Sequence, residues 1–81
     1  MHDENGFQVT LDLLSPGAEA RVLQVSGEGA FRRRLLELGL LPGTTVVRTG
    51  QAPLGDPLLF RVRGAVIGLR RADARAIEVA A

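Results

Sequence analysis

The spacing of hydrophobic residues along the chain predicts a fold made mainly of short strands. Between residues 57 and 64 the pattern alternates strictly, so that Leu58, Phe60 and Val62 share one face of a strand and point to a core. A second strand is expected at residues 43–51, where β-branched residues predominate. Apolar stretches bounded by turn residues predict further strands at residues 18–27, 65–70 and 77–79.

One stretch has helical spacing instead. Phe31, Leu35 and Leu38 fall on one narrow arc when successive residues are ~100° apart, which predicts an α-helix over residues 29–38 with this arc in the core. Gly39 follows at the place where a left-handed cap is needed. We expect the next residue, a leucine, to fold back onto Leu35.

Together these elements favour a mainly β fold. Four or five short strands, a single α-helix between the first and second strands and no βαβ alternation fit a small antiparallel barrel that closes its own edges. A phase change between Val22 and Leu23 predicts a β-bulge in the first strand. Residues 71–76 fit one helical turn. With 81 residues the chain forms a single domain, expected at residues 11–81 after a flexible leader at residues 1–10.

Composition excludes several kinds of chemistry. The chain has no cysteine and one histidine, His2, and no two carboxylates have the spacing of an acid/base pair. We therefore expect no enzyme and no cofactor. His2, Asp3 and Glu4 carry donors that suit a divalent ion, so a small metal carrier that depends on residues 1–5 is one alternative. Because ordering ligands at a chain end costs entropy, we expect no functional metal site there.

The N-terminal residues and the length of the apolar runs indicate the cellular location of the chain. The first nine residues are acidic and polar, unlike the basic start and apolar stretch of a secretory signal. The longest apolar runs have three or four residues, far fewer than the ~20 that cross a bilayer. The expected location is the cytoplasm.

Charge argues against a polyanion as the partner. Ten arginines, no lysine and nine acidic residues leave a formal net charge of +1, whereas binding to many phosphates needs a clustered excess. The run Arg32–Arg34 spreads over roughly 200° of the helix circumference, so it does not form one phosphate clamp. A modest basic stripe is expected from Arg61, Arg63, Arg70 and Arg71. No nucleic-acid partner is expected.

The predicted helix offers one candidate surface for a protein partner. Arg33 is placed to pair with Glu37, four residues on. Leu36 and Leu41 are not required by the core arc and would form an apolar spot rimmed by arginine. Arg33, Leu36 and Leu41 are therefore candidate partner-binding residues. The alternative is a solvated amphipathic helix packed on the barrel.

The loop at residues 52–58 is the first candidate for partner contact. Two prolines and a glycine fix its backbone at low entropic cost, and Leu54 is expected at its tip. A rigid exposed loop of this kind is a good recognition element. The candidate partner-binding residues here are Leu54, Gly55, Asp56 and Pro57. Alternatively, Asp56 and Pro57 simply form a turn between two strands.

Three motifs in order extend over most of the chain. They are Leu-Leu-Glu-Leu-Gly-Leu with Pro-Gly behind it, Ala-Pro-Leu-Gly-Asp-Pro, and a late Leu-Arg-Arg followed by Ala and Ile. In this order and spacing the sequence resembles the ferrous iron transport protein A (FeoA) family from about Leu11 to Val79. The resemblance implies an SH3-like β-barrel in the cytoplasm, without catalytic residues. It also implies a domain that binds and modulates the cytosolic GTPase part of the membrane ferrous iron transporter FeoB.

A similar barrel forms the C-terminal domain of metal-dependent repressors of the DtxR type. Regulation of transcription or binding of nucleic acid is therefore the alternative function that the resemblance leaves open. No winged-helix region precedes the predicted barrel and the chain begins at Met1, so we expect a stand-alone protein. Weak self-association would follow if four leucines are exposed together: Leu36, Leu41, Leu54 and Leu59.

Overall fold

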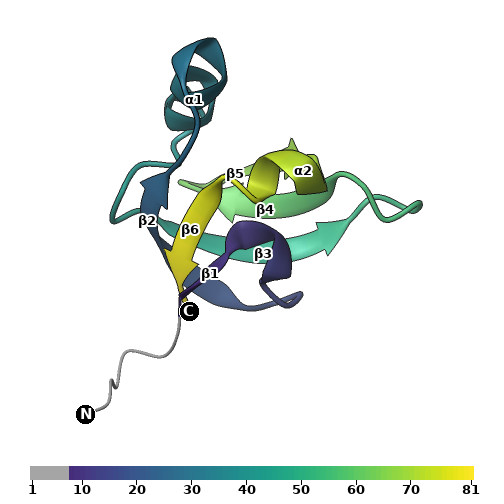
Figure 1. The fold of residues 1–81 in the computed structure, drawn as a ribbon. Helices are drawn as coiled ribbons and strands as arrows, with labels where there is room; N and C mark the ends of the chain where they lie inside the picture. The colour runs from purple at the N-terminus through teal and green to yellow at the C-terminus, as the bar shows by residue number, and fades with distance from the viewer. Residues whose placement is uncertain (1–7) are drawn as a thin grey trace.

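Six strands form a single antiparallel sheet in the computed structural model, which describes residues 8–81 (Figure 1). The strands are β1 (Gln8–Thr10), β2 (Glu19–Val25), β3 (Thr45–Gln51), β4 (Leu58–Val62), β5 (Ala65–Leu69) and β6 (Ile77–Ala80). Their order in the sheet is β1-β6-β2-β3-β4-β5, and every neighbouring pair is antiparallel. The expected mainly β, antiparallel fold is confirmed.

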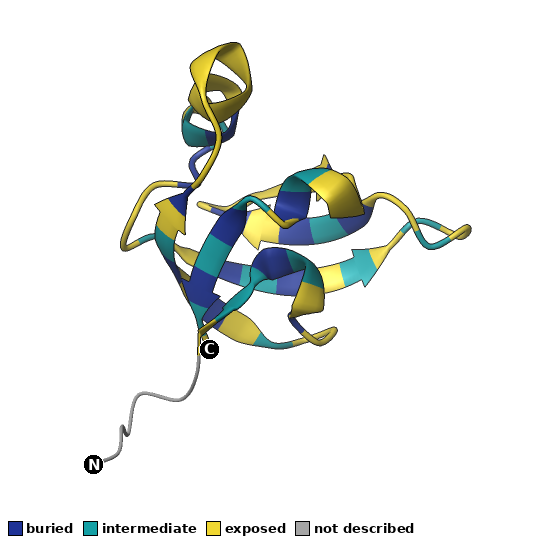
Figure 2. Cartoon of the chain, viewed as in Figure 1, coloured by how far each residue is buried: buried dark blue, intermediate teal, exposed yellow. Residues whose placement is uncertain are grey.

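The sheet curls around one hydrophobic core. In β4, Leu58, Phe60 and Val62 are buried, as the alternation predicts, and Arg61 between them is exposed. Buried side chains from β2, β3 and β6 join them, and along these strands they alternate with more accessible ones (Figure 2). Leucines from η1, α1 and β5 also belong to this core. Burial of a side chain as large as leucine or phenylalanine contributes about 1.5–3 kcal/mol. Because the domain is so small, this one core is the main source of its stability.

Strand β1 corrects the expected start of the domain. We expected residues 1–10 to be a flexible leader, but Gln8–Thr10 pair along β6, with Val9 opposite Val79. Val9 is half-buried and packs against the core. The folded part therefore begins before Leu11, and residues 1–7 of the expected leader lie outside the described residues.

Hydrogen bonds do not close the sheet into a complete barrel. β1 and β5 stand at the two ends of the strand order, and no ladder joins them within residues 8–81. The expectation that the barrel closes its own edges is wrong in this respect, and β5 keeps one free edge.

Two bulges interrupt the ladders. The register between β2 and β6 shifts between Val22 and Gln24, which leaves Leu23 as the extra residue that the phase change predicted. A second shift, which the sequence did not reveal, lies in β3 between Arg48 and Gly50. A bulge re-aims nearby side chains, and Arg48 at this one is only 6% exposed.

Two α-helices and one 3₁₀ turn accompany the sheet: η1 (Leu11–Leu13), α1 (Gly29–Glu37) and α2 (Arg71–Ala74). The helical turn predicted at residues 71–76 corresponds to α2. The helix predicted at residues 29–38 corresponds to α1, which follows the second strand because β1 was not predicted. No helix in the described part of the chain has the length and apolar character to cross a membrane.

The C-terminal end of α1 is fixed as its sequence predicts. Gly39 adopts a positive φ of 102°, which a residue with a side chain rarely tolerates. Its N–H donates to the carbonyl oxygen of Leu36 (3.0 Å), and the N–H of Leu40 donates to that of Leu35 (3.3 Å). This pair of bonds is a Schellman cap, and it folds buried Leu40 back toward buried Leu35.

The N-terminal turns of α1 project away from the sheet (Figures 1 and 2). Phe31, expected in the core, is 38% exposed, whereas Leu35 on the same arc is 3% exposed. The prediction was wrong for Phe31 because the helix packs on the barrel through its last turn only. Near its start, the helix is held by Arg32, whose Nε donates to the carbonyl oxygen of Val25 at 3.1 Å.

Candidate functional site

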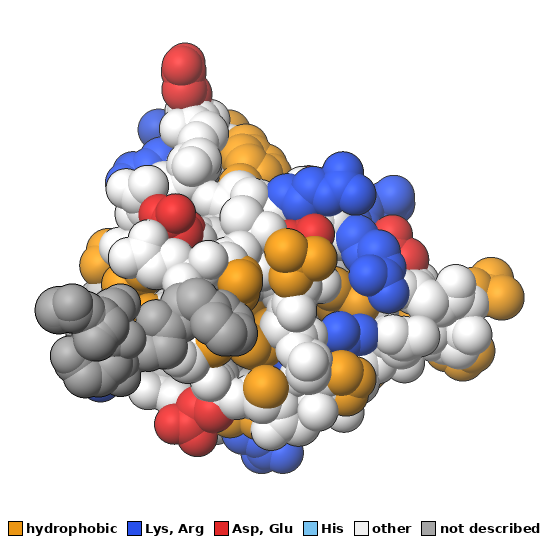
Figure 3. All heavy atoms as spheres, turned by 60° about the horizontal axis from the view of Figure 1, so that its bottom comes forward, with side chains coloured by type: hydrophobic (Ala, Val, Ile, Leu, Met, Phe, Trp, Pro, Cys, Tyr) orange, Lys and Arg blue, Asp and Glu red, His pale blue; other side chains and the backbone are white. Residues whose placement is uncertain are grey.

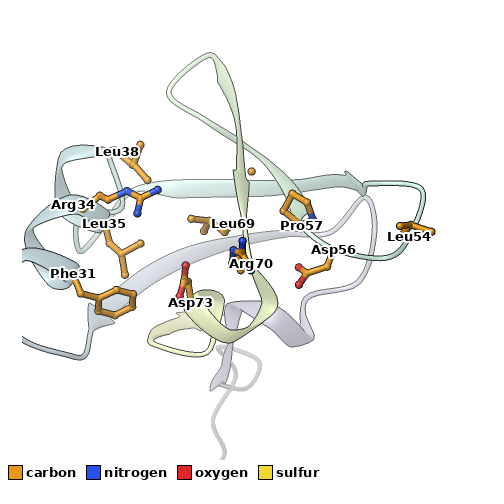
Figure 4. Close-up of a pocket in the computed structure, with 11 residues that line it drawn as sticks. Phe31, Arg34, Leu35, Leu38, Leu54, Asp56, Pro57, Leu69, Arg70 and Asp73 are labelled. Atoms are coloured by element: carbon orange, nitrogen blue, oxygen red, sulfur yellow. The ribbon is translucent and has the colours of Figure 1, made fainter.

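A groove separates α1 from the loop between β3 and β4 (Figure 4). It encloses about 600 Å³, in the range of sites that bind ligands or peptide side chains. Its apolar lining consists of Phe31, Leu35, Leu38, Leu54, Pro57 and Leu69. The groove is therefore a concave, largely apolar feature within residues 8–81.

One wall of the groove is the apolar arc of α1. Phe31, Leu35 and Leu38 all line it, at the helical spacing that the sequence predicts. Leu35 reaches the core, while Phe31 and Leu38 remain partly accessible. The arc thus exists as predicted, but of its three residues only Leu35 is buried in the core.

The opposite wall is the loop that carries Leu54. The leucine side chain is 97% exposed at the loop tip. The loop is closed by two backbone hydrogen bonds, from the N–H of Ala52 to the carbonyl oxygen of Pro57 (2.9 Å) and from the N–H of Gly55 to that of Ala52 (2.8 Å). A fixed backbone presents Leu54 to a partner at little further cost in entropy.

Arg71 ties this loop to α2. The backbone N–H of Arg71, at the first position of α2, donates to Oδ1 of Asp56 at 2.9 Å. The Nε of Arg71 donates to the carbonyl oxygen of Gly55 at 3.1 Å. Asp56 therefore satisfies one of the unpaired N–H groups at the start of a helix, as a capping residue does. It has a structural role besides any contact with a partner.

Arg48 braces the same loop from the interior. Its Nη2 donates to Oε1 of Gln51 (2.7 Å), its Nε to the carbonyl oxygen of Gly50 (3.3 Å) and its Nη1 to that of Leu14 (2.8 Å). These bonds connect the end of β3, where the loop begins, to the segment after η1. Sequence reasoning missed this role, since the only signal was a single arginine in a β-branched stretch.

The charges around the groove are balanced. Arg34 and Arg70 line it together with Asp56 and Asp73. On the face drawn in Figure 3, arginine side chains gather in one patch, with acidic side chains directly beside them. Within residues 8–81 one ion pair is formed, between Nε of Arg75 and Oδ2 of Asp12 at 3.5 Å. The expected pair between Arg33 and Glu37 is not formed.

The structure brings together part of the candidate set. Leu54, Asp56 and Pro57 line the groove, and Gly55 lies between them in the loop. The other three candidates lie outside the groove. Of these, Leu36 is half-buried and packed against the core, whereas Arg33 and Leu41 are exposed.

The four leucines considered for self-association are not all exposed. Leu36 and Leu59 are half-buried, while Leu41 and Leu54 are exposed. Self-association was expected if all four leucines were exposed together, and only two of them are exposed. It stays a prediction.

Residues 8–81 contain no group of three or more histidine, cysteine, aspartate or glutamate side chains placed to hold a metal ion. The candidate donors His2, Asp3 and Glu4 lie outside the described residues.

Comparison with known proteins places the chain in a family. A model of the FeoA domain matches residues 9–81. The chain belongs to the FeoA family. The solution structure of FeoA from Chlorobium tepidum superposes with a TM-score of 0.81 at 39% identity, covering 89% of this chain and 69% of that chain. FeoA from Stenotrophomonas maltophilia, a prokaryotic SH3 domain protein solved in complex with zinc, gives a TM-score of 0.77 at 33% identity and covers 88% of each chain. The expected SH3-like fold is confirmed.

A further FeoA relative is joined to a transporter. The Fe(2+) transport protein A/Fe(2+) transporter FeoB fusion protein of Porphyromonas gingivalis is 42% identical to this chain over 69 residues. The match covers 85% of this chain and 8% of the fusion protein, so the chain corresponds to a small part of that relative. The FeoA family thus takes part in ferrous iron transport, and in this relative an FeoA domain lies in one polypeptide with FeoB.

Proposed function

We propose that this FeoA domain binds the cytosolic GTPase part of a FeoB-type ferrous iron transporter and modulates its activity. In this proposal it acts in the cytoplasm, through protein–protein contacts and without catalysis of its own. The observation that carries the proposal is the fusion in Porphyromonas gingivalis, where a related domain is held permanently beside FeoB. Covalent linkage raises the effective concentration of two modules that bind each other, so fusion is expected where they work together.

The groove between α1 and the β3–β4 loop is the proposed contact surface. It offers exposed apolar side chains on both walls, Phe31 on α1 and Leu54 on the loop. Both walls are fixed, α1 by its cap and the loop by its bonds to Arg71. Protein interfaces are organised in this way, with a few rigid apolar anchors surrounded by polar groups.

Modulation follows if the contact distinguishes two states of the GTPase. A partner that binds one nucleotide state more tightly shifts the population toward that state by its difference in binding free energy. The FeoA domain needs no catalytic group for this effect.

Alanine variants of the two walls test the proposed surface. We expect Phe31→Ala and Leu54→Ala each to weaken binding to the purified cytosolic GTPase domain by roughly tenfold or more, as loss of an interface anchor does. The matched control is Leu13→Ala, because Leu13 is an exposed leucine of η1 outside the groove. Isothermal titration calorimetry gives the dissociation constants, and circular dichroism confirms that each variant is folded.

Two results would count against the proposal. Unchanged affinity in both groove variants would move the contact to another surface of the domain. Failure of the unaltered protein to bind either the GTPase domain or the full-length transporter would refute the proposed function itself.

A further inference from the structure

The strand β5 has a free edge, and part of this strand lines the groove. β5 has one neighbour in the sheet, β4, and no loop, cap or turn hydrogen bond in the described part of the chain involves residues 65–69. An edge strand exposes a row of unpaired N–H and C=O groups to which another strand can add. Most of β5 is accessible, and only Leu69 is buried.

The turn before β5 determines which backbone groups point outward. Val62 pairs with Ala65, and the two residues between them have positive φ, 53° at Arg63 and 82° at Gly64. Such a two-residue turn makes its flanking residues a hydrogen-bonded pair, and pairs alternate along an antiparallel ladder. The N–H and C=O groups of Val66 and Gly68 therefore point away from β4, toward the free edge.

The two ends of α1 lie near the two ends of β5. Its cap lies at the β4–β5 turn, because a Cβ added to Gly39 would come within 3.2 Å of Cγ1 of Val62 and 3.5 Å of Cδ of Arg63. At the other end of α1, Phe31 lines the groove with Arg70, which follows β5 (Figure 4). Gly68 lines the same groove. The groove is thus bounded by a helix and by the free backbone groups of Gly68, and the edge of β5 continues beyond the groove to Val66.

The chemistry of the edge indicates what fits there. Residues 65–69 are Ala-Val-Ile-Gly-Leu, with no charge and no proline. Gly68 has no side chain over its backbone, and the charged residues that line the groove are two arginines and two aspartates. An uncharged strand complements this uncharged edge. The rim, with equal numbers of arginines and aspartates, gives no net electrostatic attraction to a segment that carries a net charge. Five residues at about 3.3 Å each would cover the edge.

We propose that the groove binds an extended, uncharged segment of the partner that adds to β5 as a further strand. Val66 and Gly68 supply its backbone hydrogen bonds, and alternate apolar side chains of the segment contact the α1 wall at Phe31. Peptides that add to a sheet edge are held in this way, with main-chain bonds for affinity and pockets for every second side chain. The inference rests on the proposed function only for the identity of the partner.

A synthetic peptide tests strand addition without the transporter. The probe is an acetylated and amidated seven-residue peptide of alternating threonine and valine, and its control is the same peptide with N-methyl groups on alternate residues, which cannot form one ladder edge. We expect the first peptide to slow amide hydrogen exchange at Val66 and Gly68 by roughly tenfold or more at saturation, and the methylated one to have no effect. Equal binding of both peptides, or protection confined to the β3–β4 loop, would overturn the inference.

A backbone variant carries the test to the cytosolic GTPase domain. Val66→Pro removes the outward N–H without removing a bond to β4, a position where an edge strand tolerates proline. Val66→Ala is the matched control, because it keeps the N–H and shortens the side chain. We expect the proline variant to lose roughly 3–10-fold in affinity, as for one backbone hydrogen bond, and the alanine variant to lose less. Exchange in the unaltered protein gives the same answer if the proline variant does not fold.

The outcomes separate the two proposals. Binding of the GTPase domain without protection of Val66 and Gly68 would overturn strand addition and keep the proposed function. Binding of the peptide but of neither the GTPase domain nor the full-length transporter would do the reverse. Failure of the peptide, the GTPase domain and the full-length transporter to bind would overturn both proposals.

Discussion

At the scale of single residues, Arg48 carries a charge into the interior where only neutral acceptors meet it. The side chain is 6% exposed, and its three recorded hydrogen bonds go to two backbone carbonyls and one side-chain amide. The ion pair recorded among residues 8–81 involves other side chains. Burying a charge is unfavourable unless it is well hydrogen-bonded, so the planar geometry of the guanidinium is essential at this position.

We expect Arg48→Lys to lower the free energy of unfolding by about 2 kcal/mol. A single ammonium group cannot reach three acceptors that surround a planar fork, yet it remains buried. Chemical denaturation followed by circular dichroism measures the change. An unchanged transition midpoint would show that the fork geometry does not matter.

Asp56 shows how a candidate contact residue can also be structural. Its carboxylate accepts the N–H of Arg71 at the start of α2. We expect Asp56→Ala to lower the free energy of unfolding by about 1 kcal/mol, the usual effect of losing a capping side chain, and Asp56→Asn to have a much smaller effect because the amide oxygen still accepts the bond. Thermal unfolding of both variants tests this, and equal stability of the two would argue against a cap. Leu54 is therefore the cleaner position for binding experiments.

At the scale of elements, α1 is anchored at one end and accessible at the other. The Schellman cap and buried Leu35 fix its last turn, while Phe31 faces the groove. A helix anchored at one end can present a side chain such as Phe31 to a partner, because its own stability does not depend on that side chain.

We expect Leu35→Ala to lower the free energy of unfolding by roughly 2–5 kcal/mol, the usual effect of emptying a core leucine site. Phe31→Ala should lower it by less than about 1 kcal/mol, because surface substitutions rarely exceed that range. Urea denaturation of the two variants under the same conditions compares them directly. Similar losses in both would mean that α1 packs through its whole arc.

The elements that local patterns specify were predictable from the sequence. The alternation of β4, the bulge at Leu23 and the glycine cap of α1 each depend on a few neighbouring residues, and the structure contains all three. β1 was missed because three residues without a turn signal carry too little pattern, and pairing with β6 decides their conformation. The spacing of Phe31, Leu35 and Leu38 revealed a shared face, but spacing does not say what covers that face.

At the scale of the whole molecule, the groove was the part that the sequence could not show. The loop wall with Leu54, Asp56 and Pro57 was predicted, but its distance and angle to α1 depend on how the curled sheet places segments that are far apart in the chain. The free edge of β5 is likewise a property of the strand order, which no local pattern contains. The family match and the fusion of a relative to FeoB are likewise information that no local pattern contains.

The most direct test of the account is a calorimetric titration of this protein into the cytosolic GTPase domain of its cognate FeoB, with and without a non-hydrolysable GTP analogue. A duplex DNA titration at two salt concentrations is the control. We expect saturable binding to the GTPase domain, with an affinity that depends on the nucleotide, and no binding to DNA. Absence of binding to the GTPase domain, together with DNA binding that weakens steeply with salt, would contradict it and favour a nucleic-acid function.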